Sequence, residues 1–163
     1  ALFVPSDVPR SGAGEPYGYL KATNDPRYLF ELAPADVAAA IAEAERVMAR
    51  DGGIEAGLLS RGVLGLHASG VSWDPELFGA WARDHMYGPL NDVEAEKISE
   101  YCNAAMDDFS QLVLIRPDVP MFRYFEGLAL ACSGKCSDAA ALLEDVRIPE
   151  ARVLLTEIRR SCR

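Results

Sequence analysis

Residues 124–139 read Tyr-Phe-Glu-Gly-Leu-Ala-Leu-Ala-Cys-Ser-Gly-Lys-Cys-Ser-Asp-Ala. The apolar run that ends at Gly134 has the composition of a helix, and a glycine directly after such a run typically ends it. Gly127 and Ala139 place small residues on either side of this turn, where they allow two successive helices to pack closely. The stretch therefore predicts a helical hairpin with its turn at Gly134.

The pattern of small and apolar residues around this hairpin repeats with a period of 34 residues. A fixed period of this length indicates that one helix–turn–helix unit follows another along the chain. The paired positions are Cys102 and Cys136, Ala105 and Ala139, Phe109 and Leu143, and Leu112 and Val146.

On these residues the segment 98–147 resembles the tetratricopeptide repeat family. In that family a glycine in the first helix precedes a glycine in the turn by seven residues, and a small alanine follows five residues later. A Sel1-like repeat is the second resemblance, and a generic helical bundle with a coincidental period is the alternative to both. Val93 departs from the pattern, because the first helix of the preceding unit should carry glycine there. The matching residues are Gly127, Gly134 and Ala139, and, at the end of the preceding unit, Ala105, Phe109, Leu112 and Pro117.

Helix start and stop signals divide the remaining sequence into further helices. Asp74-Pro75 is typical of a helix start, and Asp51-Gly52-Gly53 is typical of an end. We expect about seven helices and no strand, which is an all-α fold of antiparallel helical hairpins stacked as a short superhelix like that of tetratricopeptide proteins. The expected helices cover about residues 34–51, 54–67, 75–85, 91–115, 120–133, 136–146 and 150–161.

The first 33 residues differ in composition from the rest, because they contain seven prolines and glycines, which exclude a long helix. We expect residues 1–33 to form an extended arm with a short turn near Asp25–Phe30, and residues 34–163 to form a single helical-repeat domain. Aromatic side chains of the arm are expected to pack on the helical body, and contact with a partner is the alternative.

The chain is acidic, with a net charge of −9 from 16 basic and 25 acidic residues. This charge opposes binding to nucleic acid and to anionic lipid, both of which require clustered lysine and arginine. Solubility is the simplest role for the acidity, and a basic protein partner is the other.

The chain begins with Ala1 rather than methionine, which indicates either a cleaved signal peptide or an artificial boundary. Together with an even number of cysteines, this favours an exported, periplasmic protein. We expect membrane association only through an anchor that would precede Ala1.

The four cysteines are placed symmetrically about two prolines. Cys102 and Cys132 are equidistant from Pro117, and Cys136 and Cys162 are equidistant from Pro149. If the prolines mark the centres of helical hairpins, two disulfides form, Cys102–Cys132 and Cys136–Cys162, each contributing on the order of 3 kcal/mol to stability. The alternatives are a Cys132–Cys136 bond, four free thiols, or a zinc site.

Motifs for catalysis are scarce. The only histidines, His67 and His85, lack the spacing of a metal site, and we expect neither a metal nor a cofactor. Phosphate-binding loops and hydrolase elbows are also absent from the sequence. Paired carboxylates could serve in glycoside cleavage, although on helices they more often form solvated faces. These pairs are Glu43/Glu45, Glu94/Glu96, Asp107/Asp108 and Glu144/Asp145.

The resemblance implies a surface that binds peptides or protein subunits. We therefore expect a non-catalytic interaction module, or an assembly factor of an exported complex, whose partner is another protein. A small helical envelope enzyme acting on a glycan such as peptidoglycan is the alternative. Arg123 and Tyr124, in the most aromatic helix, are the candidate partner-binding residues if they are exposed, and core packing is the other role for this run.

Overall fold

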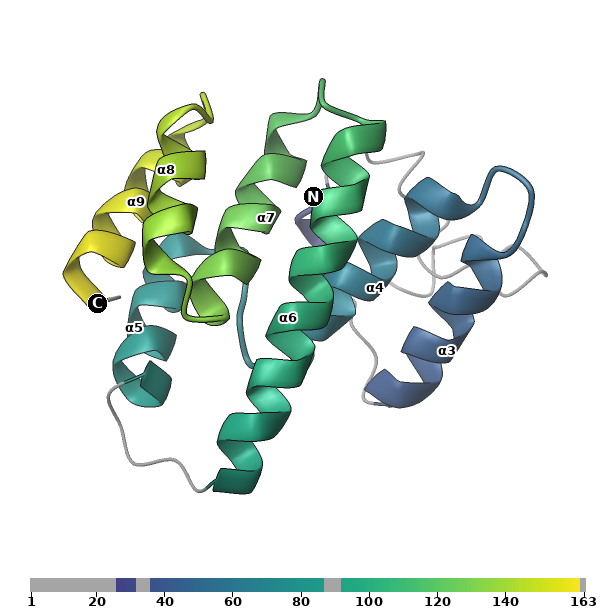
Figure 1. The fold of residues 1–163 in the computed structure, drawn as a ribbon, viewed down its shortest axis with the longest axis horizontal. Coiled ribbons are helices and arrows are strands. Elements are labelled where there is room, and N and C mark those ends of the chain that lie inside the picture. The colour runs from purple at the N-terminus through teal and green to yellow at the C-terminus, as the bar shows by residue number, and fades with distance from the viewer. Residues whose placement is uncertain (1–25, 32–35, 87–91, 162–163) are drawn as a thin grey trace.

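The computed structural model describes residues 26–31, 36–86 and 92–161, and it contains only helices and connecting turns within these ranges (Figure 1). The all-α fold class is therefore confirmed. The helices are α2 (Tyr28–Glu31), α3 (Val37–Met48), α4 (Ile54–Ala68), α5 (Pro75–Met86), α6 (Asp92–Ile115), α7 (Pro120–Cys132), α8 (Cys136–Glu144) and α9 (Pro149–Ser161). Within the described ranges, no helix combines the length and the hydropathy of a membrane span.

The expected helix boundaries hold where local capping chemistry sets them. At the start of α5, the Asp74 carboxylate accepts a hydrogen bond from the backbone N–H of Glu76 at 2.9 Å. Gly70 and Gly134 follow α4 and α7 at a φ of 83°, a backbone conformation that favours glycine and ends each helix. The start of α3 is capped by Asp36. The predicted start at Pro34 lies outside the described residues.

The C-terminal half folds as antiparallel neighbours. Helices α6 and α7 pack together about Pro117, α7 packs on α8, and α8 packs on α9. Pro149 is the first residue of α9 rather than the centre of the α8–α9 connection, because proline suits the first turn of a helix. The hairpin centred on Pro117 is confirmed, whereas the centre of the last hairpin lies a few residues before the predicted one.

Helix α5 breaks the expected order of stacking. Successive helices were expected to be neighbours, but α5 packs mainly against the C-terminal α9, while α4 packs directly on α6 (Figure 1). Phe78 and Trp81 are buried on α5, and the carboxylate of Glu157 on α9 occupies the space that a methyl group at Gly79 would fill. Apolar burial and this close approach hold α5 at the far end of the molecule.

The residues that repeat with the 34-residue period share a packing role. Ala105 and Ala139 are both fully buried, as are Phe109 and, nearly so, Leu143. A Cβ at Gly127 would lie 2.7 Å from Leu143 Cδ2, so the glycine allows α8 to approach α7 closely. The spacing that suggested a repeat thus predicted real helix–helix contacts.

Of the predicted arm, only residues 26–31 are described, and residues 1–25, 32 and 33 lie outside that part. The expected turn near Asp25–Phe30 is present as the short α2. Leu29 and Phe30 are buried, and the Phe30 ring meets the Phe125 ring edge-on at 5.3 Å. At Phe30 the prediction that arm aromatics pack on the helical body is confirmed.

Replacing Gly62 by alanine is expected to lower the free energy of unfolding by about 1–2 kcal/mol, although alanine is the better helix former by about 1 kcal/mol. A Cβ at Gly62 would lie 2.7 Å from the fully buried ring of Phe109, so the ring or one of the two helices would have to shift to make room. Urea denaturation of the two proteins measures the difference.

The control for this prediction is the pair Gly62→Ala and Phe109→Leu in one chain. The smaller leucine vacates the space, so the double variant should lose less stability than the sum of the two single variants. A stabilised Gly62→Ala protein would show that α4 and α6 are not as close as described.

Candidate functional site

The candidate site lies where α3, α4 and α6 meet. Glycines of α4 allow its two neighbours to approach: a Cβ at Gly57 would overlap the Met48 side chain of α3, and one at Gly65 would lie 3.1 Å from the Tyr101 carbonyl oxygen of α6. Small residues in α4 therefore permit close packing of both neighbouring helices. Three helices thus bring polar side chains from distant parts of the sequence to one place.

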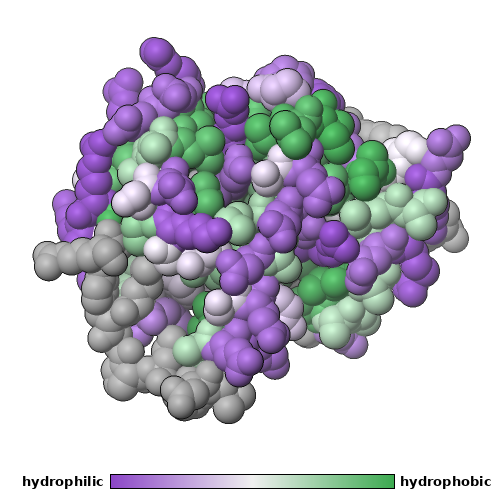
Figure 2. Space-filling model, in the orientation of Figure 1, coloured by the Kyte–Doolittle hydropathy of each residue, from purple (hydrophilic) through white to green (hydrophobic). Residues whose placement is uncertain are grey.

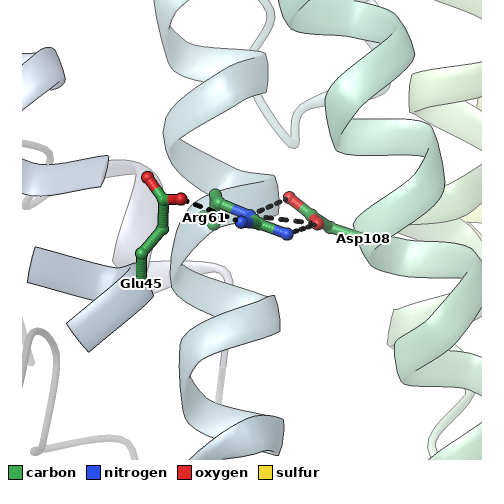
Figure 3. Close-up of polar contacts among 3 residues, drawn as sticks. All are labelled: Glu45, Arg61 and Asp108. Atoms are coloured by element: carbon green, nitrogen blue, oxygen red, sulfur yellow. Dashed lines mark hydrogen bonds and ion pairs between the residues drawn. The ribbon is translucent and has the colours of Figure 1, made fainter. Parts of the chain in front are cut away.

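An ion pair joins α4 to α6 at the wall of this site (Figure 3). The Arg61 guanidinium donates through Nη2 to Asp108 Oδ1 at 2.8 Å, and through Nε to both carboxylate oxygens at 3.1 Å. Glu45 of α3 lies on the other side of Arg61, with its Oε2 3.5 Å from Nη1. Arg61 therefore connects carboxylates from two different helices, a geometry that suits its planar fork of donors.

The two carboxylates beside Arg61 differ in exposure. The side chain of Asp108 is 2% exposed and that of Glu45 is 55% exposed. Burial raises the pKa of Asp108, and the hydrogen bonds and charge of Arg61 oppose that rise. The hydrogen bonds to Asp108 raise the pKa of Arg61. Asp108 is thus a buried anchor of the ion pair, whereas Glu45 faces solvent.

A cleft of about 520 Å³ opens beside this ion pair. Its rim carries the exposed carboxylates of Glu45, Glu100 and Asp107, and its apolar part includes Ile41 and Tyr101. Figure 2 shows hydrophobic surface between α3 and α6, next to hydrophilic side chains of α6. Since Arg61 and Asp108 offset each other in charge, the exposed rim is negative.

The carboxylate pairs noted in the sequence are only partly brought together. Asp107 and Asp108 both line the cleft, and Glu45 joins them from α3. Glu43 instead forms an ion pair with Arg46 on its own helix. The remaining carboxylate pairs noted in the sequence do not line this cleft: Glu94/Glu96 and Glu144/Asp145.

The two candidate partner-binding residues of α7 lie in different environments. Tyr124 is fully buried, and its hydroxyl donates a hydrogen bond to the Trp73 carbonyl oxygen at 2.5 Å, so this residue has the core-packing role that was weighed against partner binding. Burial raises the pKa of Tyr124. Arg123 is half-buried, and its buried Nε makes no hydrogen bond with a described residue. Its role in binding a partner stays a prediction.

The cysteines confirm one of the two predicted bonds. Cys102 of α6 and Cys132 of α7 form a disulfide across the hairpin centred on Pro117, with their Cα atoms 5.8 Å apart. This bond excludes the alternative Cys132–Cys136 pairing, and it excludes free thiols at both of its positions. Cys136 is also disulfide-bonded. Its predicted partner, Cys162, lies outside the described residues.

Metal ligands do not cluster in the described part of the chain, where no group of three or more histidine, cysteine, aspartate and glutamate side chains could hold an ion. His85 instead stacks on Trp81 with ring centroids 4.9 Å apart, and its Nδ1 lies 2.9 Å from the Trp81 carbonyl oxygen. His67 is exposed near the end of α4.

Comparison of the chain with protein-family models, with curated proteins and with solved structures finds no match.

Proposed function

We propose that this chain is a non-catalytic protein-interaction module, or an assembly factor, that holds a basic segment of another protein in the cleft between α3, α4 and α6. The observation that carries the proposal is the solvent-open cleft of about 520 Å³ with exposed carboxylates at its rim. Its size is within the range of small-ligand and side-chain pockets.

Charge supports a basic partner. Glu45 is only partly offset by Arg61 at 3.5 Å, because the same guanidinium makes shorter contacts to Asp108. Glu100 and Asp107 are exposed, and neither carboxylate forms an ion pair or a hydrogen bond with a described residue. A partner that brings lysine or arginine would therefore meet a negative rim, which increases the association rate and selects against acidic partners.

The apolar part of the cleft suits the same partner. Ile41 and Tyr101 are half-buried beside the charged rim. Lysine and arginine bury their aliphatic stems on apolar surface while their charged heads stay near carboxylates. The apolar part of the cleft and its acidic rim therefore suit a long basic side chain better than a purely polar ligand.

The binding test uses a ten-residue peptide of alternating lysine and alanine as the probe, titrated calorimetrically into the protein. We expect binding that weakens with added salt, and an affinity about tenfold lower in the variant Glu100→Gln/Asp107→Asn. The control Glu96→Gln/Asp138→Asn removes the same charge from exposed positions outside the cleft and should bind as the parent does. Equal weakening in both variants would mean that only net charge attracts the peptide.

A second candidate function is cleavage of a glycan, favoured by one observation. The cleft gathers carboxylates from α3 and α6, and burial raises the pKa of Asp108, the direction that a general acid requires. However, three hydrogen bonds from Arg61 engage this carboxylate. Incubation with purified peptidoglycan separates the candidates: we expect no release of soluble fragments, and release that is lost in Asp107→Asn would favour the enzyme.

We also propose that the helices form a repeat of the tetratricopeptide kind and that the protein works in an oxidising compartment such as the periplasm. The packing of Gly127 on Leu143 supports the first proposal. The disulfide between Cys102 and Cys132 supports the second, because reducing compartments keep thiols free. Non-reducing peptide mapping of protein purified from its native cells tests the compartment: recovery of both residues as thiols would contradict it.

A further inference from the structure

A second concave surface lies at the opposite end of the molecule, at the connected end of the α8–α9 hairpin. This groove has a volume of about 590 Å³ and is lined by the end of α8, the connection after it and the first turns of α9. Its apolar lining includes Val146, Ile148 and Leu155, and Val153 is 39% exposed. The hairpin therefore leaves apolar surface uncovered between its two helices.

Two arginines flank this apolar surface. Arg147 and Arg152 both line the groove and are exposed. Neither side chain forms a hydrogen bond or ion pair with any described residue, whereas Glu144, which also lines the groove, pairs with the neighbouring Arg159 at 2.9 Å. In a chain with 25 acidic residues, two arginines that pair with no carboxylate of the described ranges, beside an apolar groove, are positioned to receive carboxylates from outside.

We propose that the α8–α9 groove is a second docking site, which binds a short apolar peptide segment carrying acidic side chains. The segment's apolar residues cover Ile148 and Val153, and its carboxylates pair with Arg147 and Arg152. Charge complementarity decides this occupant, because the two exposed guanidinium groups beside the groove attract carboxylates, although the chain as a whole is acidic. The site is independent of the cleft between α3, α4 and α6, which selects the opposite charge.

The test measures fluorescence anisotropy of a labelled twelve-residue peptide, three repeats of Glu-Leu-Leu-Glu, on the intact chain. The expected result is saturable binding that weakens about tenfold in Arg147→Ala/Arg152→Ala and also weakens in Val153→Ser. A peptide with lysine in place of glutamate should not bind at this groove. The control variant Lys97→Ala removes an exposed positive charge from α6 and should bind as the parent does.

Three outcomes would overturn the proposal. One is unchanged affinity in the double arginine variant, and another is an equal effect of Lys97→Ala. The third is arginine-dependent binding to phosphatidylglycerol vesicles without binding of the acidic peptide, which would assign the groove to anionic lipid. Circular dichroism spectra of each variant, unchanged from the parent, would show that a loss of binding does not come from a loss of fold.

Discussion

Replacing Asp108 by alanine is expected to lower the free energy of unfolding by about 3–5 kcal/mol, the cost typical of breaking a buried ion pair. The substitution leaves the guanidinium of Arg61, whose side chain is only 28% exposed, beside α6 without the three hydrogen bonds that satisfy it. Urea denaturation followed by circular dichroism measures the loss.

Two further variants show whether the pair itself carries the effect. Asp107→Ala removes the adjacent, exposed carboxylate and should change stability by no more than about 0.5 kcal/mol. Arg61→Met/Asp108→Leu replaces both charges with apolar groups and should be more stable than Asp108→Ala alone. An Asp108→Ala protein as stable as the parent would mean that the pair is solvated rather than part of the packed interface.

Removing the disulfide between α6 and α7 is expected to lower the free energy of unfolding by about 3–4 kcal/mol. The bond joins residues 30 apart in sequence, and closing a loop of this length restricts the unfolded chain by about that amount. The variant Cys102→Ala/Cys132→Ala tests this by comparison with the oxidised parent in urea. Since Cys102 is fully buried and Cys132 is 7% exposed, part of the loss also comes from the smaller side chains.

Variant and parent should have the same helical content at low urea, because the bond acts mainly on the unfolded state. If the double variant unfolds at the same urea concentration as the parent, helix packing alone holds α6 against α7. Peptide mapping without reductant should recover residues 102 and 132 in one cross-linked fragment before substitution.

Local signals in the sequence predicted most of the helix boundaries. Asp74, Gly134 and Pro117 each act on their immediate neighbours through a cap, a positive φ or a missing N–H, so their effect can be derived without the fold. The position of α5 could not be derived in this way. Its place against α9 depends on contacts between residues about 80 positions apart, such as Gly79 and Glu157.

Only some residues of the candidate site could be predicted from the sequence. Asp107/Asp108 and Glu43/Glu45 are visible as carboxylate pairs, but the sequence gives no sign that Arg61 joins Glu45 to Asp108, because the three residues lie on three helices. The choice between core packing and exposure for Tyr124 also depended on the fold. Helix α7 packs against α6, α8 and α9, and these contacts bury most of its surface. The aromatic side chains of α7 are therefore mostly in the core.

The most direct test of the proposed function maps where the lysine–alanine peptide binds, by following backbone amide shifts of isotope-labelled protein in nuclear magnetic resonance spectra. We expect the largest shifts at Glu45, Glu100, Tyr101 and Asp107, and small ones in α8 and α9. Shifts centred on the α8–α9 groove, or spread evenly over every acidic residue, would contradict the assignment of the cleft as the binding surface.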